Sequence, residues 1–165
     1  MKAEDKDLLL KDLCARFPYG LKGKCEIDAS YDTSFDTIYQ LHKFDAILEG
    51  IKGDLLFVTP LIEDKDEQEF ANEEVAEGID ILDFKPYLRP MLSMTEEELF
   101  EVQDIIGKGV EIRESFISIL DSSISAFSYL ELQAVFNYFN SRHLDYNGLI
   151  PMGLAMEAPE GMYNF

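Results

Sequence analysis

The sequence predicts an α+β fold: an N-terminal helix, an antiparallel sheet of about five strands, two C-terminal helices and an extended C-terminal strap. Three observations support this prediction. The hydrophobic fraction of 47%, with 12 Phe and 8 Tyr residues, is enough for one core. Strand-like segments follow one another with spacers too short for parallel returns. Two capping boxes then introduce helical patterns. We expect one acidic domain over residues 1–165.

The first helix is predicted over Ala3–Arg16, and the segment "FPYG" ends it because Pro18 disfavours helical geometry at the preceding residue. Its apolar stripe follows helical spacing and consists of Leu10, Leu13, Cys14 and Phe17. The N-terminus has no pattern of a signal peptide. Cys14 and Cys25 are therefore expected to be reduced thiols in a cytoplasm, with a disulfide between them as the alternative.

Five segments have the composition and apolar alternation of strands. They are Gly23–Ser30, Ser34–Leu41, Lys43–Gly50, Asp54–Leu61 and Gly78–Phe84. The fourth segment is apolar on both faces, which is typical of an inner strand. Their order predicts a meander behind the first helix rather than an alternating α/β arrangement.

Two helices are predicted in the C-terminal half. Thr95 and Glu98 form a capping box before an apolar stripe of Leu99, Val102 and Ile106, and "GKG" ends that helix. Ser128 and Glu131 form a second capping box. The buried face of the second helix is predicted to consist of Leu132, Val135, Phe136 and Phe139. Between the helices, the pattern over 109–127 fits either a strand or a helix.

The segment "FKPYLRPMLSMTEEE" (Phe84–Glu98) reads as a joint between the sheet and a helix. Pro86 and Pro90 cannot donate backbone hydrogen bonds, so neither is expected in a paired inner strand. The alternative is an anion site, in which Lys85 and Arg89 lie near the free amides of a helix N-terminus.

The net charge of −19 makes some kinds of binding partner unfavourable. It opposes direct binding to nucleic acid and to anionic membranes, and no apolar run is long enough to span a bilayer. The acidic segment Glu63–Asp83 is interpreted as a solvated loop between two strands. Two alternatives stay open for it: a carboxylate cluster for Ca²⁺ or Mg²⁺, and mimicry of a phosphate backbone.

The motifs of common active sites are absent from the sequence, including GxSxG, HExxH and the P-loop. No catalytic residue, metal site or cofactor is therefore expected. His143 and Asp145 in "HLD" could supply two metal ligands, but a histidine that bonds the last carbonyls of a helix is the simpler interpretation. The candidate surface for a ligand or partner consists of Lys85, Arg89, His143 and Asp145.

The segment "HLDYNGLIPMGLAMEAPEGMYNF" (His143–Phe165) combines apolar residues with Gly and Pro. It is interpreted as a buried strap, and the alternative is an apolar, Met-bearing strip for a partner.

Two segments, "KPYLRPMLSMTEEE" and "HLDYNGLIPMGLAMEAPEGMY", resemble a family of small Bacteroidales proteins that often occur in prophages and other mobile regions. Members commonly read "KPYLRPMSSMTEEE" and "HFDYRGLIPKGLALEAPEGMY". The departures of this chain from those patterns include Leu92, Leu144, Asn147 and Met152, and the changes at Asn147 and Met152 remove positive charge. The resemblance covers about a fifth of the chain and implies provenance, because the family has no established reaction, cofactor or substrate.

Together these observations predict a non-enzymatic, cytoplasmic accessory protein of a phage or mobile element that acts by binding another protein. Two alternatives remain: an acidic DNA mimic that inhibits a nucleic-acid-binding protein, and an enzyme with an unrecognised carboxylate site.

Overall fold

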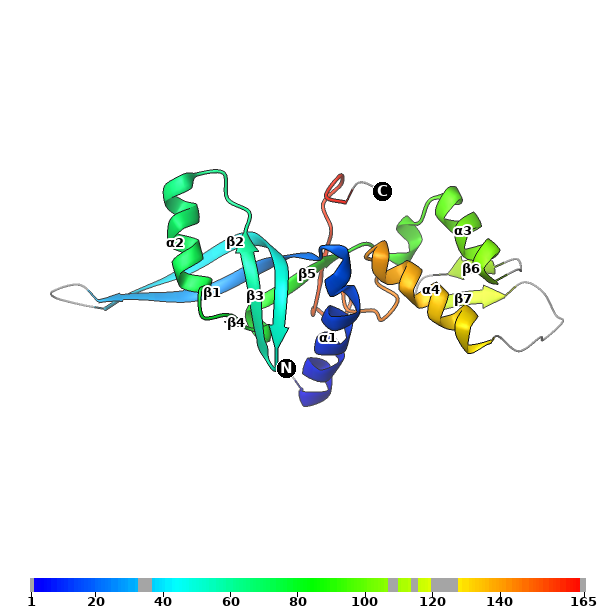
Figure 1. Ribbon diagram of the computed structural model, residues 1–165, viewed down its shortest axis with the longest axis horizontal. Helices are drawn as coiled ribbons and strands as arrows, with labels where there is room; N and C mark the ends of the chain where they lie inside the picture. Colours follow the sequence, from blue (N-terminus) through cyan, green and yellow to red (C-terminus); the bar gives the residue numbers. More distant parts are fainter. Residues whose placement is uncertain (1, 33–36, 107–109, 114–115, 120–127, 164–165) are drawn as a thin grey trace. The chain divides into compact units, whose positions relative to one another are not determined.

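A computed structural model describes residues 2–32, 37–106, 110–113, 116–119 and 128–163 (Figure 1). Its helices and mostly antiparallel strands confirm the α+β class. The chain divides into two compact units, Met1–Tyr87 (unit 1) and Leu88–Phe165 (unit 2). The expectation of one domain over residues 1–165 stays a prediction.

Unit 1 begins with helix α1 (Ala3–Arg16), which has the predicted bounds and is followed by a 3₁₀ turn that ends at Gly20. The predicted stripe is only partly right. Leu13 is buried, but Cys14 and Phe17 are exposed. The buried face is rotated because Asp12 and Arg16, one turn apart, are buried together as an ion pair with a 2.7 Å contact. Both cysteines are free, so the alternative of a Cys14–Cys25 disulfide is wrong.

The strands of unit 1 lie in the order β4-β3-β2-β1-β5, and each neighbouring pair is antiparallel. Their bounds are β1 Lys22–Asp32, β2 Thr37–Lys52, β3 Leu55–Pro60, β4 Ile79–Asp80 and β5 Phe84–Leu88. The prediction of separate strands over 34–41 and 43–50 is wrong, because β2 is continuous through "LHK", which contains no turn residue. Residues 34–36 lie outside the described residues.

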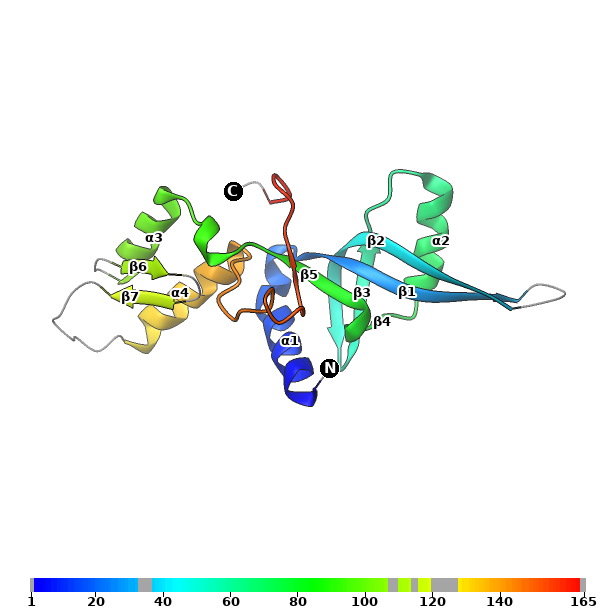
Figure 2. The same cartoon turned by 180° about the vertical axis from the view of Figure 1, so that it is seen from behind.

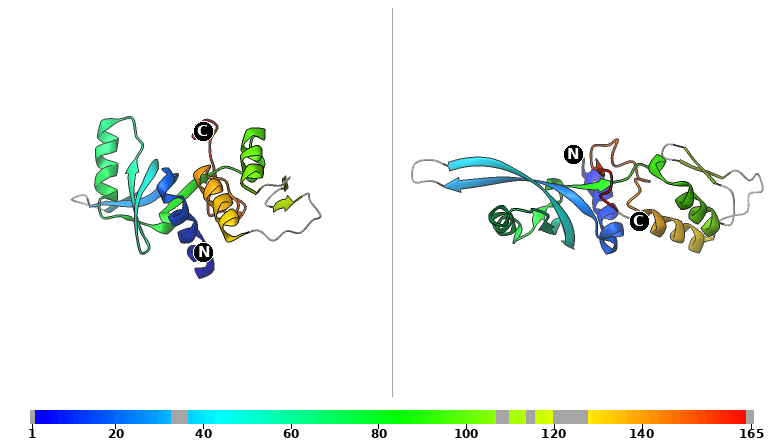
Figure 3. Two further views of the ribbon diagram at one scale, coloured as in Figure 1. Left: turned by 45° about the vertical axis from the view of Figure 1, so that its right-hand side comes forward. Right: turned by 90° about the horizontal axis from the view of Figure 1, so that it is seen from above.

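The β1–β2 hairpin is longer than the rest of the sheet. β1 pairs with β2 from Lys22 to Asp32, whereas its register with β5 covers only Gly23 to Cys25. The distal part of the hairpin therefore extends as a two-stranded arm, which Figure 3 shows from above.

The acidic segment is helical rather than a loop over part of its length. Helix α2 (Lys65–Val75) packs against β3, and the Asp64 side chain caps it by accepting bonds from the amides of Asp66 and Glu67 at 3.0 and 3.1 Å. Acidic residues in the first turn stabilise the positive end of the helix dipole. The loop interpretation is wrong there because sparse apolar residues, Ala71 and Val75, suffice to bury one face.

The predicted strand over 78–84 is divided into β4, a 3₁₀ turn over Ile81–Asp83 and β5. β5 continues past Phe84 and lies beside β1 (Figure 2). Pro86 lies inside this strand, opposite Gly23 of β1, and β5 has neighbours on both sides, so the expectation that Pro86 stays outside a paired inner strand is wrong. A Cβ atom at Gly23 would clash with the Phe84 ring and lie 2.7 Å from the Lys85 carbonyl oxygen, so this close approach requires glycine.

The described residues of unit 2 form two α-helices, a hairpin and the C-terminal segment. Its elements are a 3₁₀ turn at Met91–Ser93, α3 Glu96–Ile106, β6 Val110–Arg113, β7 Phe116–Ile119, α4 Tyr129–Ser141 and β8 Met156–Glu157. The ambiguous stretch thus contains two paired strands, and its remaining residues lie outside the described ones.

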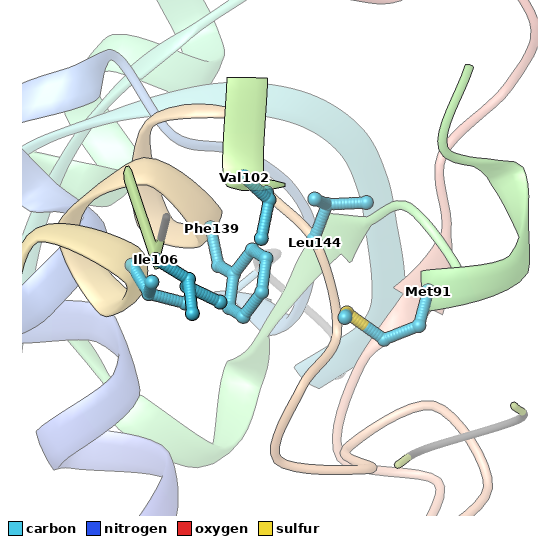
Figure 4. Packing of buried hydrophobic residues seen from close by; sticks show 6 residues of the cluster. Met91, Val102, Ile106, Phe139 and Leu144 are labelled. Atoms are coloured by element: carbon cyan, nitrogen blue, oxygen red, sulfur yellow. The ribbon is translucent and has the colours of Figure 1, made fainter. Parts of the chain in front are cut away.

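The core of unit 2 forms where α3 and α4 meet the residues on either side of them. Buried side chains from these elements point toward one another in Figure 4: Met91, Val102, Ile106, Phe139 and Leu144. Val135 belongs to the same cluster. Val102 and Ile106 confirm the predicted stripe of α3. In the C-terminal segment, Leu149, Leu154 and Ala155 are buried, which confirms the strap, while Met152 and Met156 are exposed. No helix among the described residues is long and apolar enough to cross a membrane.

Candidate interaction surfaces

Arg89 is bound to the first turn of α3. Its guanidinium donates to both carboxylate oxygens of Glu98 at 2.7 and 2.8 Å and to the Ser93 carbonyl at 3.0 Å. Glu98 also accepts a bond from the Thr95 amide at 2.9 Å, and the Thr95 hydroxyl accepts one from the Glu98 amide, which completes the predicted capping box. Burial acts to raise the pKa of Glu98, but the bonds from Arg89 and Thr95 outweigh it and lower that pKa.

This network uses the Arg89 guanidinium that the anion-site hypothesis requires. An anion there would compete with a bidentate carboxylate and would lie near the charges of Glu97 and Glu101. Lys85 belongs to unit 1, where it lies in β5 opposite Lys24 of β1. The site formed by Lys85 and Arg89 therefore stays a prediction, and the contacts of Arg89 give it no support.

His143 ends α4 in the left-handed conformation, with φ of +52°. Its amide donates to the Asn140 carbonyl at 3.1 Å, and the next amide, that of Leu144, donates to the Phe139 carbonyl at 3.0 Å. These two bonds and the Phe139–Leu144 contact in the core form a Schellman motif, which usually has glycine at this position. The imidazole ring is 1% exposed and stacks on the Tyr163 ring with 4.1 Å between centroids.

The Asp145 side chain stabilises the turn that follows it, over residues 145–150. Its two carboxylate oxygens accept bonds from the amides of Leu149 and Ile150 at 2.7 and 2.9 Å. The backbones of Arg89 and Leu144 form a bridge, in which the Arg89 amide donates to the His143 carbonyl and the Asp145 amide to the Arg89 carbonyl, each at 2.8 Å. The structure thus brings Arg89, His143 and Asp145 together through the main chain. Among the residues that the structure describes, no group of three His, Cys, Asp or Glu side chains could hold a metal ion.

Two hollows in unit 2 share Arg89 and Tyr163 as lining residues, and their volumes are about 550 and 330 Å³. The larger also contains Glu101 and Arg142, whose side chains form an ion pair at 3.2 Å. The Tyr138 hydroxyl and Arg142 lower the pKa of Glu101, so Glu98 and Glu101, two of the three glutamates that line this hollow, remain ionised near neutral pH. His143 and Asp145 line neither hollow.

The apolar face of α4 is only half buried. Val135 and Phe139 lie in the core as predicted, but Leu132 and Phe136 are 43% and 44% exposed, so the prediction of a four-residue buried face is wrong. Tyr129, Leu132 and Phe136 have i, i+3, i+7 spacing, which places them on one side of the helix. We call these three residues the α4 stripe. Periodicity detects such a face in a sequence but does not show whether other elements cover it.

A third hollow lies in unit 1 and has a volume of about 450 Å³. It is lined by residues of β2, of the segment between β3 and α2, and of α2. These residues are Leu41, His42, Lys43, Phe44, Ile62, Asp66, Glu67, Phe70 and Ala71. The imidazole of His42 contacts the Phe70 ring, with 4.9 Å between centroids. No sequence signal joins β2 to α2, so this hollow was not predictable from motifs. We call it the α2 hollow.

Comparison with models of protein families, with curated proteins and with solved structures finds no match to this chain. The resemblance to the Bacteroidales family therefore stays a prediction.

Proposed function

We propose that the protein acts by binding another protein through the α4 stripe. The observation that supports this proposal is the exposure of Tyr129, Leu132 and Phe136 beside the core of unit 2, at 76%, 43% and 44%. Exposed apolar side chains that lie together on one helix face are typical of surfaces that associate with other proteins.

Phe136 of the stripe is held in place by contacts within unit 2. The Phe136 ring contacts the Tyr146 ring at 5.3 Å between centroids, and Tyr146 contacts the buried Phe139 ring at 5.8 Å. The Tyr146 hydroxyl donates to the Asn140 side-chain oxygen at 3.0 Å. An aromatic side chain fixed in this way loses little conformational freedom on binding, which favours a contact that contributes strongly to affinity.

The surroundings of the stripe indicate a partner bound through apolar contact rather than charge. α4 contains a single charged residue, Glu131, in a chain of which 28% of residues are charged. On the solvent side of the stripe lie Gln133 and Asn137, which are exposed and neutral. We therefore expect association to be nearly insensitive to salt, because screening acts on exposed charges. The DNA-mimic alternative predicts the opposite, a complex that salt releases.

Site-specific photocrosslinking in the protein's native cells tests this proposal. A photoreactive phenylalanine analogue is placed at Leu132 or Phe136 and, as a control, at Phe100, which is 62% exposed on α3. The proposal predicts one defined protein adduct from both stripe positions and none of that mass from the control position. The same adducts from all three positions, or no adduct from the stripe, would contradict it.

A further inference from the structure

The walls of the α2 hollow combine apolar surface with negative charge, and all of its lining residues belong to unit 1. Among its lining residues, Phe44 and Ala71 are buried, and Phe70 and Ile62 are half-buried. Leu41, which also lines the hollow, is 49% exposed. A volume of about 450 Å³ lies within the range of about 300–1,000 Å³ typical of ligand sites.

The charge around this hollow is mostly negative. α2 contains five Asp or Glu residues and one Lys, and Asp66 and Glu67 in its first turn line the hollow. Lys43 of β2 also lines the hollow, but it forms an ion pair with Glu26 at 2.9 Å, which offsets its charge. A group that enters the apolar interior therefore passes a rim that favours positive charge.

We propose that the α2 hollow binds a peptide segment of a partner protein in which one large apolar side chain is flanked by Lys or Arg residues. The apolar side chain contacts Phe44, Phe70 and Ala71, and the flanking cations lie beside Asp66 and Glu67. This site goes beyond the proposed function, since it belongs to unit 1 and its binding depends on salt, whereas the α4 stripe belongs to unit 2.

Fluorescence anisotropy with short labelled peptides tests the proposal on the full chain. The first probe has a central tryptophan between two pairs of lysines, the second has alanine in place of tryptophan, and the third has glutamates in place of lysines. We expect only the first to bind, with affinity that falls as salt rises from about 50 to 500 mM, because the Debye length shrinks to a few ångströms. Amide NMR shifts on titration should change at Phe70 and Ala71.

Two double variants that remove the same number of charges distinguish the effect of the carboxylates that line the hollow from the effect of the negative charge of α2 as a whole. D66N/E67Q removes two charges that line the hollow, and E69Q/E73Q removes two exposed charges from the same helix that do not. The first should weaken binding about threefold to tenfold, the range expected for two exposed ion pairs, and the second should weaken it less than twofold. Thermal melts check that both variants fold.

Equal weakening by the two variants, equal binding of the tryptophan and alanine probes, or no binding at millimolar peptide would each overturn the proposal. The stripe variant L132D/F136D should bind the first probe like the wild type. Failure of this proposal is thereby distinguishable from failure of the proposed function.

Discussion

Replacement of His143 by glycine and by alanine separates two roles of this residue. The backbone of His143 ends α4 at a φ of +52°, and its buried ring stacks on Tyr163. Both variants lose the ring, so both should be less stable than the wild type, by about 2–4 kcal/mol for loss of a buried side chain and its aromatic contact. The two variants should differ in the cost of the left-handed backbone conformation. Glycine adopts this conformation freely, whereas alanine pays about 1 kcal/mol.

The expected order of stability is therefore wild type, then H143G, then H143A, with about 1 kcal/mol between the two variants. Urea denaturation followed by circular dichroism measures this difference. Asn137, an exposed residue within α4, is the matched control, and there N137A should be more stable than N137G by about 1 kcal/mol. If H143A is as stable as H143G, or more so, the Schellman geometry assigned to this helix end is wrong.

Three further predictions concern buried groups. The pKa of Glu98 is lowered in the folded state, so its contribution to stability is fully present above its unfolded pKa of about 4.3 and is lost as pH falls through the folded pKa. E98Q should thus cost about 2 kcal/mol at pH 7 and progressively less as pH falls below about 4, as measured by urea midpoints. A cost that does not change with pH would refute the pairing with Arg89. F139A should lower the free energy of unfolding by about 3–5 kcal/mol, whereas F136A on the same helix should lower it by about 1 kcal/mol or less, and similar costs would show that Phe136 is not exposed. Burial raises the pKa of Cys25 to about 12, so a thiol reagent at pH 8 should modify Cys14 alone in the native protein, and rapid reaction of both thiols would contradict the burial of Cys25.

Local signals in the sequence predict much of this fold. The bounds of α1 follow from its composition and the turn after it, and both capping boxes occur with the bonds that the pattern requires. The missed helix, α2, has few apolar residues, so its periodicity is weak. Asp64 followed by acids in a first helical turn was the available signal.

The candidate surfaces were less predictable, because they depend on which elements cover a residue. The spacing of Leu132 and Phe136 equals that of core residues, and only the packing of unit 2 shows that half of this face is exposed. His143 occupies a position where glycine is the usual residue, so its sequence context gave no warning of a left-handed helix end. The sequence places Arg89 shortly before a helix N-terminus, a pattern that suggests an anion site, but it does not show that the Arg89 guanidinium binds Glu98.

The most direct test of the central claim is the affinity of the partner crosslinked through the α4 stripe for the wild type and for L132D/F136D, measured by calorimetry at about 50 and 500 mM salt. If the stripe is the binding surface, the double variant should bind about 30-fold or more weakly, and wild-type affinity should change little with salt. The control variant L130D, on another side of the same helix, should bind normally. Unchanged affinity of L132D/F136D, or release of the wild-type complex by salt, would contradict this claim.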